Sequence, residues 1–312
     1  MSRIPTSTVL ISAAFLIFGC GGSLFTRFIS RAVEQDSTRM EYIPNKITHP
    51  LLPDVGLSIL WIGHASVLIQ IHDKVFLTDP VFERTVGMLS RRVVEAGIDP
   101  ATLSHVDYIL ISHTHFDHLN YGSLSELPKQ GKLLIPFGAA AYTPEFGFQE
   151  TREMKPWEMF EEDGVRITAV PAQHFSGRYG FDIFWTDGEG YAGYVIQYKE
   201  KTVYFAGDTG YRDSLFTRIG ERFRIDVALL PIAPLEPREF MSRVHLDPQR
   251  AVQAFAGLHA KLMIPIHHRT FSQGLESSVM QAQEELEKIV SDVRLQGKVY
   301  IMKIGEQKIV DE

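Results

Sequence analysis

Four short apolar runs in this chain end on residues that are able to bind metal ions. The runs are rich in β-branched side chains and are bounded by turn-forming residues, a pattern typical of buried β-strands. They span residues 108–112, 165–170, 202–206 and 262–266. Burying a lone Asp or His after a strand costs several kcal/mol unless the side chain is paired or coordinated. The repetition therefore predicts that these strands share one edge and a common metal site.

The first run is followed by the densest group of candidate ligands, His113-Thr114-His115-Phe116-Asp117-His118. After the other three runs come His174, Asp208 and His267. Nitrogen and oxygen ligands in this number suit a catalytic site for two zinc ions with room for water, although iron or manganese could occupy the same ligands. We expect one set of His113, His115 and His174, a second set of Asp117, His118 and His267, and Asp208 as a bridge between them. Asp117 could instead be a general base, but so close to the metals it is favoured as a ligand.

The amino-acid composition limits which kinds of site, partner and domain organisation this chain can have. The only cysteine is Cys20, so the rest of the chain can form neither an internal disulfide nor a thiolate metal site. The formal net charge of -7 gives no electrostatic footprint for nucleic acid, and we expect no nucleic-acid partner. A chain of 312 residues can form one α/β domain of about 250 residues with a terminal appendage, or two domains. One domain is favoured.

The amino terminus predicts attachment to a membrane. An apolar run from Val9 to Phe18 is followed by small residues, as in a secretory signal. Gly19 and Cys20 with the residues before them resemble the lipobox of bacterial lipoproteins, which implies cleavage before Cys20 and its acylation. We therefore expect a signal peptide over 1–19, a membrane-proximal tether over 20–50, a hydrolase domain over 51–312 and a location in the bacterial cell envelope. A single uncleaved transmembrane anchor is the alternative, because no charge occurs between Ile4 and Thr26.

The remaining pattern predicts a mixed sheet with helices on both faces. One helix is expected to begin at Pro248 with Asp247 as its cap, and a second to span 278–295, just before Gly297. Tight turns join the early strands, whereas helical segments separate the later ones. The other expected strands span 57–62, 66–71, 74–78, 133–135, 191–198, 227–230 and 299–303.

The order of the candidate ligands resembles the metallo-β-lactamase superfamily. The resemblance covers about residues 51–312 and rests on His113-x-His115-x-Asp117-His118 followed by His174, Asp208 and His267. It implies a four-layered αββα sandwich of two mixed β-sheets with the metal site at one edge. True β-lactamases of this fold usually have a cysteine at the position of Asp208, so the chain is closer to the phosphodiesterase and lactonase branches.

A narrower resemblance is to the N-acylphosphatidylethanolamine-hydrolysing phospholipase D family. It rests on five segments, which run from Trp61 to Ile69, from Leu77 to Pro80, from Phe205 to Tyr211, from Glu236 to Phe240 and from His245 to Pro248. The family's Ile-His-Trp-Gly-Thr-Phe ending is present from Ile266 to Phe271 with His268-Arg269 in place of Trp-Gly, which alters the pocket wall.

This likeness implies a zinc-dependent phosphodiesterase of phospholipase D type that acts on N-acylphosphatidylethanolamine or a related phospholipid through metal-activated hydroxide. Asp117, Asp208 and His245 are the expected catalytic residues, and His245, Arg178 and Tyr211 the expected substrate contacts. His245 could equally be structural, and Arg178 could only solvate a turn. His64 and Asp79 are expected to orient the ligands. The alternative function is a lactonase or phosphodiesterase acting on a small soluble metabolite.

Overall fold

The computed structural model describes residues 39–310 except 88–89, 180–181, 183–188, 272–274, 276–277 and 293–294. The predicted signal peptide, Cys20 and most of the predicted tether lie outside the described residues, so the predicted lipid attachment stays a prediction. Within the described ranges, no helix has both the length and the apolar character needed to cross a bilayer.

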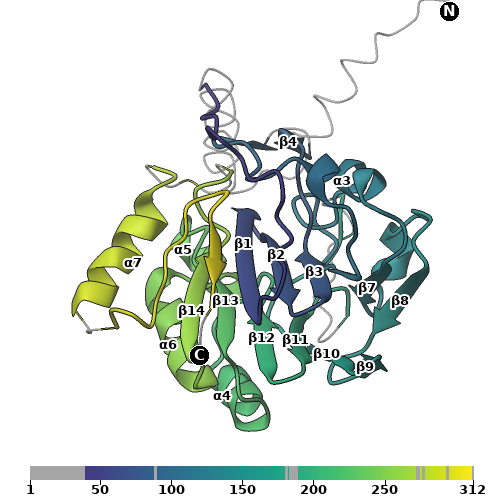
Figure 1. Ribbon diagram of the computed structural model, residues 1–312. Coiled ribbons are helices and arrows are strands. Elements are labelled where there is room, and N and C mark those ends of the chain that lie inside the picture. The colour runs from purple at the N-terminus through teal and green to yellow at the C-terminus, as the bar shows by residue number, and fades with distance from the viewer. Residues whose placement is uncertain are drawn as a thin grey trace, which may run out of the picture. The chain divides into compact units, whose positions relative to one another are not determined.

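Two mixed β-sheets form the centre of the fold (Figure 1). In the first sheet, β3, β6, β7 and β8 run parallel, whereas β15, β1, β2 and β3 pair antiparallel. Its strands, in spatial order, are β15 (Gln307–Ile309), β1 (Leu57–Gly63), β2 (Ser66–Ile71), β3 (Lys74–Thr78), β6 (Tyr108–Leu110), β7 (Lys132–Pro136) and β8 (Glu150–Met154). A short hairpin of β4 (Thr85–Val86) and β5 (Ser90–Arg91) forms a separate small sheet.

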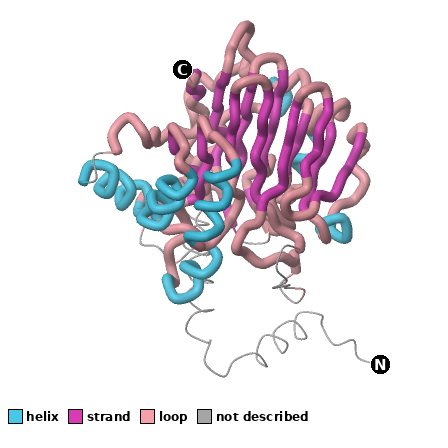
Figure 2. The backbone as a smooth tube through the Cα atoms, turned by 90° about the horizontal axis from the view of Figure 1, so that it is seen from below, coloured by secondary structure: helices cyan, strands magenta, loops and turns pink. Residues whose placement is uncertain are grey.

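The second sheet combines a parallel half with an antiparallel half. β12, β13 and β14 are parallel, and β9 to β12 pair antiparallel. Its strands, in spatial order, are β14 (Leu262–Ile266), β13 (Val227–Pro231), β12 (Lys201–Phe205), β11 (Gly193–Tyr198), β10 (Val165–Val170) and β9 (Met159–Glu162). Figure 2 shows the strands running side by side through the domain, with helices toward its outside.

Three buried clusters define four layers. One cluster joins side chains of both sheets, such as Trp61 and Phe76 with Tyr194 and Phe205. A second packs the outer face of the second sheet against helices, and a third covers the outer face of the first sheet. The helices and 3-10 turns are η2 (Pro100–Thr102), α3 (Tyr121–Glu126), η3 (Ala139–Tyr142), α4 (Asp213–Arg222), α5 (Arg238–Val244), α6 (Pro248–Leu258) and α7 (Gln281–Asp292). The predicted αββα sandwich is confirmed.

Local sequence explains the elements that hold the site. The strands β1, β2 and β14 are apolar on both sides because each lies between the other sheet and a covering layer. Asp247 caps α6 as expected, since its side chain accepts a hydrogen bond from the Arg250 N–H at 2.8 Å. Consecutive parallel strands place their carboxyl ends at the same edge, which is where the candidate ligands follow.

Two expectations differ from the structure. Residues 41–50 were expected in the tether, yet the Glu41 N–H bonds the Val93 carbonyl at 2.8 Å and Ile43 packs on the central core, so the contacts of the domain begin before residue 51. The segment 299–303 forms no strand. Within this segment only Val299 forms β-bridges, and these bridges are isolated. Val299 pairs with Met263 at the edge of the second sheet, and the pairing does not extend along the segment.

Candidate metal centre

The loop from His113 to His118 follows β6 at the edge where the two sheets meet. β6 lies between the parallel strands β3 and β7, so its carboxyl end opens beside the end of β3 and Asp79. The loop continues into α3, whose cap is Asn120. His113 and His118 are buried in this loop, and His115 is partly buried. The apolar strand thus delivers a run of imidazoles directly to the edge.

The first group joins His113, His115 and His174. His115 Nδ1 lies 2.7 Å from His113 Nε2 and 3.4 Å from His174 Nε2. His174 follows β10 of the second sheet, and its Nδ1–H donates to the Val244 carbonyl at 2.9 Å. Because a carbonyl only accepts, the lone pair of His174 is on Nε2 and faces the other two rings. Three ring nitrogens therefore converge on one point.

The second group joins Asp117, His118 and His267, with His64 beside them. His118 Nε2 lies 3.3 Å from His267 Nε2 and 3.5 Å from Asp117 Oδ2. The His64 Nε2–H donates to Asp117 Oδ2 at 2.9 Å, so His64 orients this carboxylate, as expected. His267 follows β14, and its own main-chain N–H bonds the His64 carbonyl at 2.9 Å. Both sheets contribute to this group as well.

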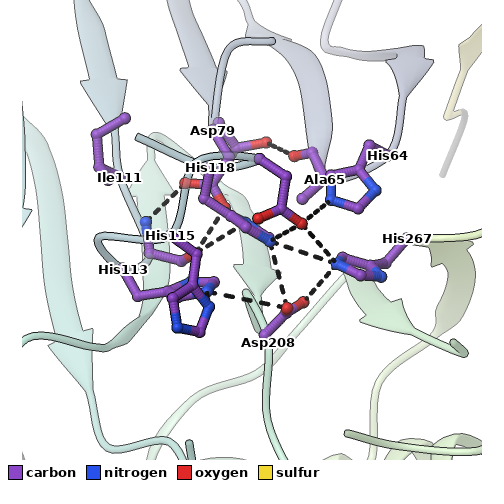
Figure 3. Close-up of polar contacts among 12 residues, drawn as sticks. His64, Ala65, Asp79, Ile111, His113, His115, His118, Asp208 and His267 are labelled. Atoms are coloured by element: carbon purple, nitrogen blue, oxygen red, sulfur yellow. Dashed lines mark hydrogen bonds and ion pairs between the residues drawn. The ribbon is translucent and has the colours of Figure 1, made fainter. Parts of the chain in front are cut away.

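Asp208 lies between the two groups (Figure 3). Its carboxylate oxygens are 3.1 Å from His267 Nε2, 3.2 Å from His118 Nε2 and 3.9 Å from His113 Nε2. The side chain is buried, and Asp208 Oδ1 accepts no hydrogen bond from the described residues. A carboxylate in this position is able to bridge two cations.

Asp79 fixes the ligand loop from the first sheet. Its carboxylate accepts hydrogen bonds from the Ser112 N–H, the Ser112 hydroxyl and His118 Nδ1–H, each at 2.6 Å. Because the Ser112 hydroxyl proton is given to Asp79, the same oxygen accepts from His113 Nδ1–H at 2.9 Å. One carboxylate thus leaves Nε2 of both His113 and His118 facing Asp208.

Replacing Asp79 with Asn is expected to lower metal affinity by about 10- to 100-fold, the usual cost of losing an outer hydrogen-bond partner of a ligand. The new amide would present a donor where His118 and Ser112 also donate. Chelator competition would measure the change. Asp107→Asn is the matched control, because Asp107 lies just before β6 and, among the described residues, its carboxylate accepts a hydrogen bond only from the Val75 N–H at 2.7 Å. Equal affinities in the two variants would contradict the role of Asp79.

Burial keeps the first group in the form that binds metal. It lowers the pKa of His115 to about 4 and that of His174 to about 3, and it holds the pKa of His113 well below its usual value. Neutral imidazoles are the ligand form, but their lone pairs repel one another unless a cation lies between them. In each of the two groups every residue offers one ligand atom, and these atoms lie within 4.8 Å of one another. The donor sets therefore fit transition-metal ions such as zinc.

The pKa of His118, in the second group, is shifted in the opposite direction to the pKa values of the first group. Burial lowers its pKa, but Asp208, Asp117 and Asp79 outweigh burial and raise the pKa well above the usual value. Once metal is stripped from the protein, His118 is protonated at neutral pH, so loading metal must release this proton. We expect apparent affinity to rise about tenfold per pH unit until the pH passes the pKa of His118. Calorimetry in two buffers of different ionisation enthalpy measures the protons released, and zero release would contradict the assignment.

The structure places the three residues that were expected to contact substrate in different surroundings. His245, at the end of α5, lies with Nδ1 3.6 Å from Asp208 Oδ2, and this nitrogen has no hydrogen-bond partner among the described residues. Tyr211 turns to the start of α4, where its hydroxyl donates to Asp213 at 3.0 Å. Arg178 is 7% exposed, and its guanidinium donates to main-chain carbonyls of the ligand loop. Neither Tyr211 nor Arg178 presents its polar end to the site in this structure, and their contact with substrate stays a prediction.

The sequence analysis placed His268 in the pocket wall but predicted neither its stacking partner nor the backbone strain around the site. The His268 ring stacks on Trp61 at 4.6 Å between centroids, and the Trp61 N–H donates to the His64 carbonyl at 2.9 Å. The sequence feature that could have indicated this stacking is the replacement of the family's Trp-Gly by His268-Arg269. His64, Asp79 and His267 all have positive φ angles of 57°, 33° and 61°. Such left-handed backbone in non-glycine residues costs about 1–3 kcal/mol each and concentrates at functional sites.

The fold and the clustered His and Asp side chains define a metal-dependent hydrolase. Residues 74–268 match the family described as the Beta-lactamase superfamily domain, and the chain belongs to that superfamily. The predicted recognition of the superfamily is confirmed.

Two relatives are similar to the chain in sequence, and one solved structure shares its fold. It is 29% identical to N-acyl-phosphatidylethanolamine-hydrolyzing phospholipase D 1 of Caenorhabditis elegans, over 75% of this chain and 70% of the worm protein. It is 32% identical to a UPF0173 metal-dependent hydrolase of Methanopyrus kandleri, over 80% of this chain and 98% of the archaeal protein. The structure of isothiocyanate hydrolase from Delia radicum gut bacteria shares the fold, with a TM-score of 0.65, 20% identity and coverage of 80% and 98% of the two chains.

Proposed function

We propose that this hydrolase is a dinuclear zinc phosphodiesterase of phospholipase D type that acts on N-acylphosphatidylethanolamine or a related phospholipid. The observation that carries the proposal is the Asp208 carboxylate, which contacts imidazoles of both ligand groups. Similarity to the worm phospholipase D supports the choice of substrate. In this assignment His113, His115 and His174 hold one zinc ion, and Asp117, His118 and His267 hold the other.

The chain's own groups have separate tasks in this proposal. Zinc ions bound here would supply an ionised water as nucleophile and would offset charge on the phosphate oxygens. Burial raises the pKa of Asp117, but His118 and His64 outweigh it and hold the pKa well below its usual value, so Asp117 is an ionised ligand and not a proton donor. Burial lowers the pKa of His245 to about 3, and its neutral ring can donate one N–H to the substrate beside Asp208.

An aromatic rim favours a lipid over a small polar substrate. The Phe175 ring lies 4.7 Å from both His115 and His174 and 6.2 Å from Phe240, measured between centroids. Phe240 is 42% exposed on α5, in the same segment that resembles the phospholipase D family. Aromatic side chains that extend from the ligands to the surface offer apolar contact to an acyl chain.

The test compares three substrate classes with the same zinc-loaded protein. N-acylphosphatidylethanolamine in mixed micelles should be hydrolysed at the phosphate–ethanolamine ester, giving phosphatidic acid and N-acylethanolamine. A small phosphodiester and a panel of lactones should be poorer substrates by kcat/KM. Activity confined to the small substrates would overturn the lipid assignment and favour a soluble metabolite. The matched variant Phe240→Ala should raise KM for the micellar lipid and leave the small phosphodiester unchanged.

A further inference from the structure

Arg178 connects the two loops that carry the first ligand group. It follows His174 by one short turn, and its Nη1 donates to the Thr114 carbonyl at 2.9 Å and the Leu119 carbonyl at 2.8 Å. These carbonyls lie near the two ends of the loop from His113 to His118. One nitrogen of the guanidinium is therefore hydrogen-bonded near both ends of the ligand loop.

The guanidinium is enclosed by aromatic rings. Its central carbon lies 4.2 Å from the Phe116 centroid and 4.1 Å from the Tyr121 centroid, and the residue is buried. In the described part of the chain no carboxylate makes an ion pair with it, so the cation is held by carbonyl oxygens and ring faces. Burying an arginine in this way is costly, and the contacts that offset the cost come mainly from the ligand loop and the helix that follows it, together with the neighbouring Tyr179.

Thr114 adds a second connection between the same loops. Its hydroxyl donates to the Gly177 carbonyl at 2.9 Å and accepts from the Gly177 N–H at 3.1 Å. Gly177 and Arg178 are consecutive, so both contacts hold the segment after His174 against the segment from His113 to His118. The distance between the two loops is thus fixed by side chains that are not themselves candidate ligands.

His115 is the ligand that most needs this support. His113, His118 and His174 each have one ring nitrogen held by Ser112, Asp79 or the Val244 carbonyl. Among the described residues, the His115 ring has hydrogen-bond contacts only with His113 and His174, which are candidate ligands too. Its position therefore depends on the backbone of its loop, and that backbone is held at the Thr114 carbonyl by Arg178.

We propose that Arg178 is a positioning residue that sets the distance between His115 and His174 and so determines the metal affinity of the first group. The inference rests on the proposed role of these histidines as metal ligands. In the second group, His118 is also held by Asp79 and Asp117 by His64, so this group should tolerate changes at Arg178 better than the first.

The test uses purified full-length protein with Arg178→Ala and Arg178→Lys, and Arg92→Lys as the matched control. Arg92 is also buried, donates to the Val81 and Glu83 carbonyls and lies over Phe271 at 4.9 Å, but it makes none of these contacts to the ligand loop. Zinc content after dialysis, stepwise affinity by chelator competition and the visible spectrum of the cobalt-substituted protein are the readouts.

We expect two zinc ions in the wild-type protein and in Arg92→Lys. Arg178→Ala should keep one, with the weaker affinity reduced about 10- to 100-fold and one cobalt band lost. Millimolar guanidinium should restore the second ion to Arg178→Ala and should change nothing in Arg92→Lys. Arg178→Lys, which keeps the charge without the planar fork, should be intermediate.

Three outcomes would overturn the inference. Arg178→Ala or Arg178→Lys could retain both ions at wild-type affinity, Arg92→Lys could lose zinc to the same extent, or guanidinium could fail to restore the second ion in a folded Arg178→Ala. A wild-type protein that binds two ions and does not hydrolyse phospholipid would overturn the proposed substrate and leave this inference intact. A wild-type protein without two bound ions would remove the basis of both.

Discussion

Asp208→Asn is expected to lower kcat by about 10³-fold, the upper end of the cost of removing one electrostatic group from an active site. The substitution keeps the size of the side chain but removes the charge that faces His113, His118 and His267. Burial raises the pKa of Asp208, but His267, His118 and His245 outweigh it and hold the pKa well below its usual value, so the native group is a carboxylate. An amide would bridge two cations poorly, and we expect the variant to lose activity and part of its metal.

Measured phospholipid turnover together with metal content per chain would check this prediction. Asp226→Asn is the matched control, because Asp226 immediately precedes β13 of the second sheet, away from the candidate ligands, and its carboxylate pairs with Lys261 at 2.8 Å and accepts from the Thr202 N–H at 2.7 Å. The control should keep both ions and full turnover. If Asp208→Asn retained two ions and normal turnover, Asp208 could not be the bridge.

Gly207→Ala is expected to destabilise the fold by about 2–6 kcal/mol, the sum of about 1–3 kcal/mol for left-handed strain and about 1–3 kcal/mol for overpacking in a dense core. Gly207 precedes Asp208 with φ of 59°, and an added Cβ would lie 2.4 Å from Ser112 Cβ. Ser112 cannot move freely, since its hydroxyl is bonded to Asp79 and His113. The same small residue therefore permits both the turn and the close approach of the two sheets.

Urea unfolding of the metal-free protein would measure this loss without a contribution from bound zinc. Gly147→Ala is the matched control, because Gly147 also has a positive φ of 79° but an added Cβ would meet nothing within 4 Å. The control should cost only the backbone strain, about 1 kcal/mol. Similar losses in both variants would show that the contact with Ser112 is not the cause.

The strands that could be predicted from the sequence are those buried on both faces. For β2 and β14 the predicted bounds match the structure, because runs without exposed residues leave little freedom of register, and the bounds of β10 match although Arg166 is exposed. β8 and β9 have sequences ETREM and MFEE and lie at sheet edges, where polar side chains hide the pattern. The edge strand β15 was missed for the same reason.

The candidate ligands were accessible to prediction because each directly follows a strand, and the structure brings all seven together. Their roles as ligands remain part of the proposed function. The position of Arg178 was not accessible, since a buried cation and a solvated turn have the same local sequence. The contact of Tyr211 was not accessible either, because only the fold shows that its hydroxyl donates to Asp213. Tertiary contacts between distant segments decide such cases.

The candidate ligands are divided between the two sheets. His113 to His118 belong to the first sheet, whereas His174, Asp208 and His267 follow strands of the second. A cation bound by ligands from both sheets would link the early and late halves of the polypeptide. Neither half could retain it alone, so capture of metal would mark the moment when the halves have docked. Removing such an ion would leave these imidazoles and carboxylates unlinked across that seam, and limited proteolysis of the metal-free protein should then cut there faster than in the metal-loaded one.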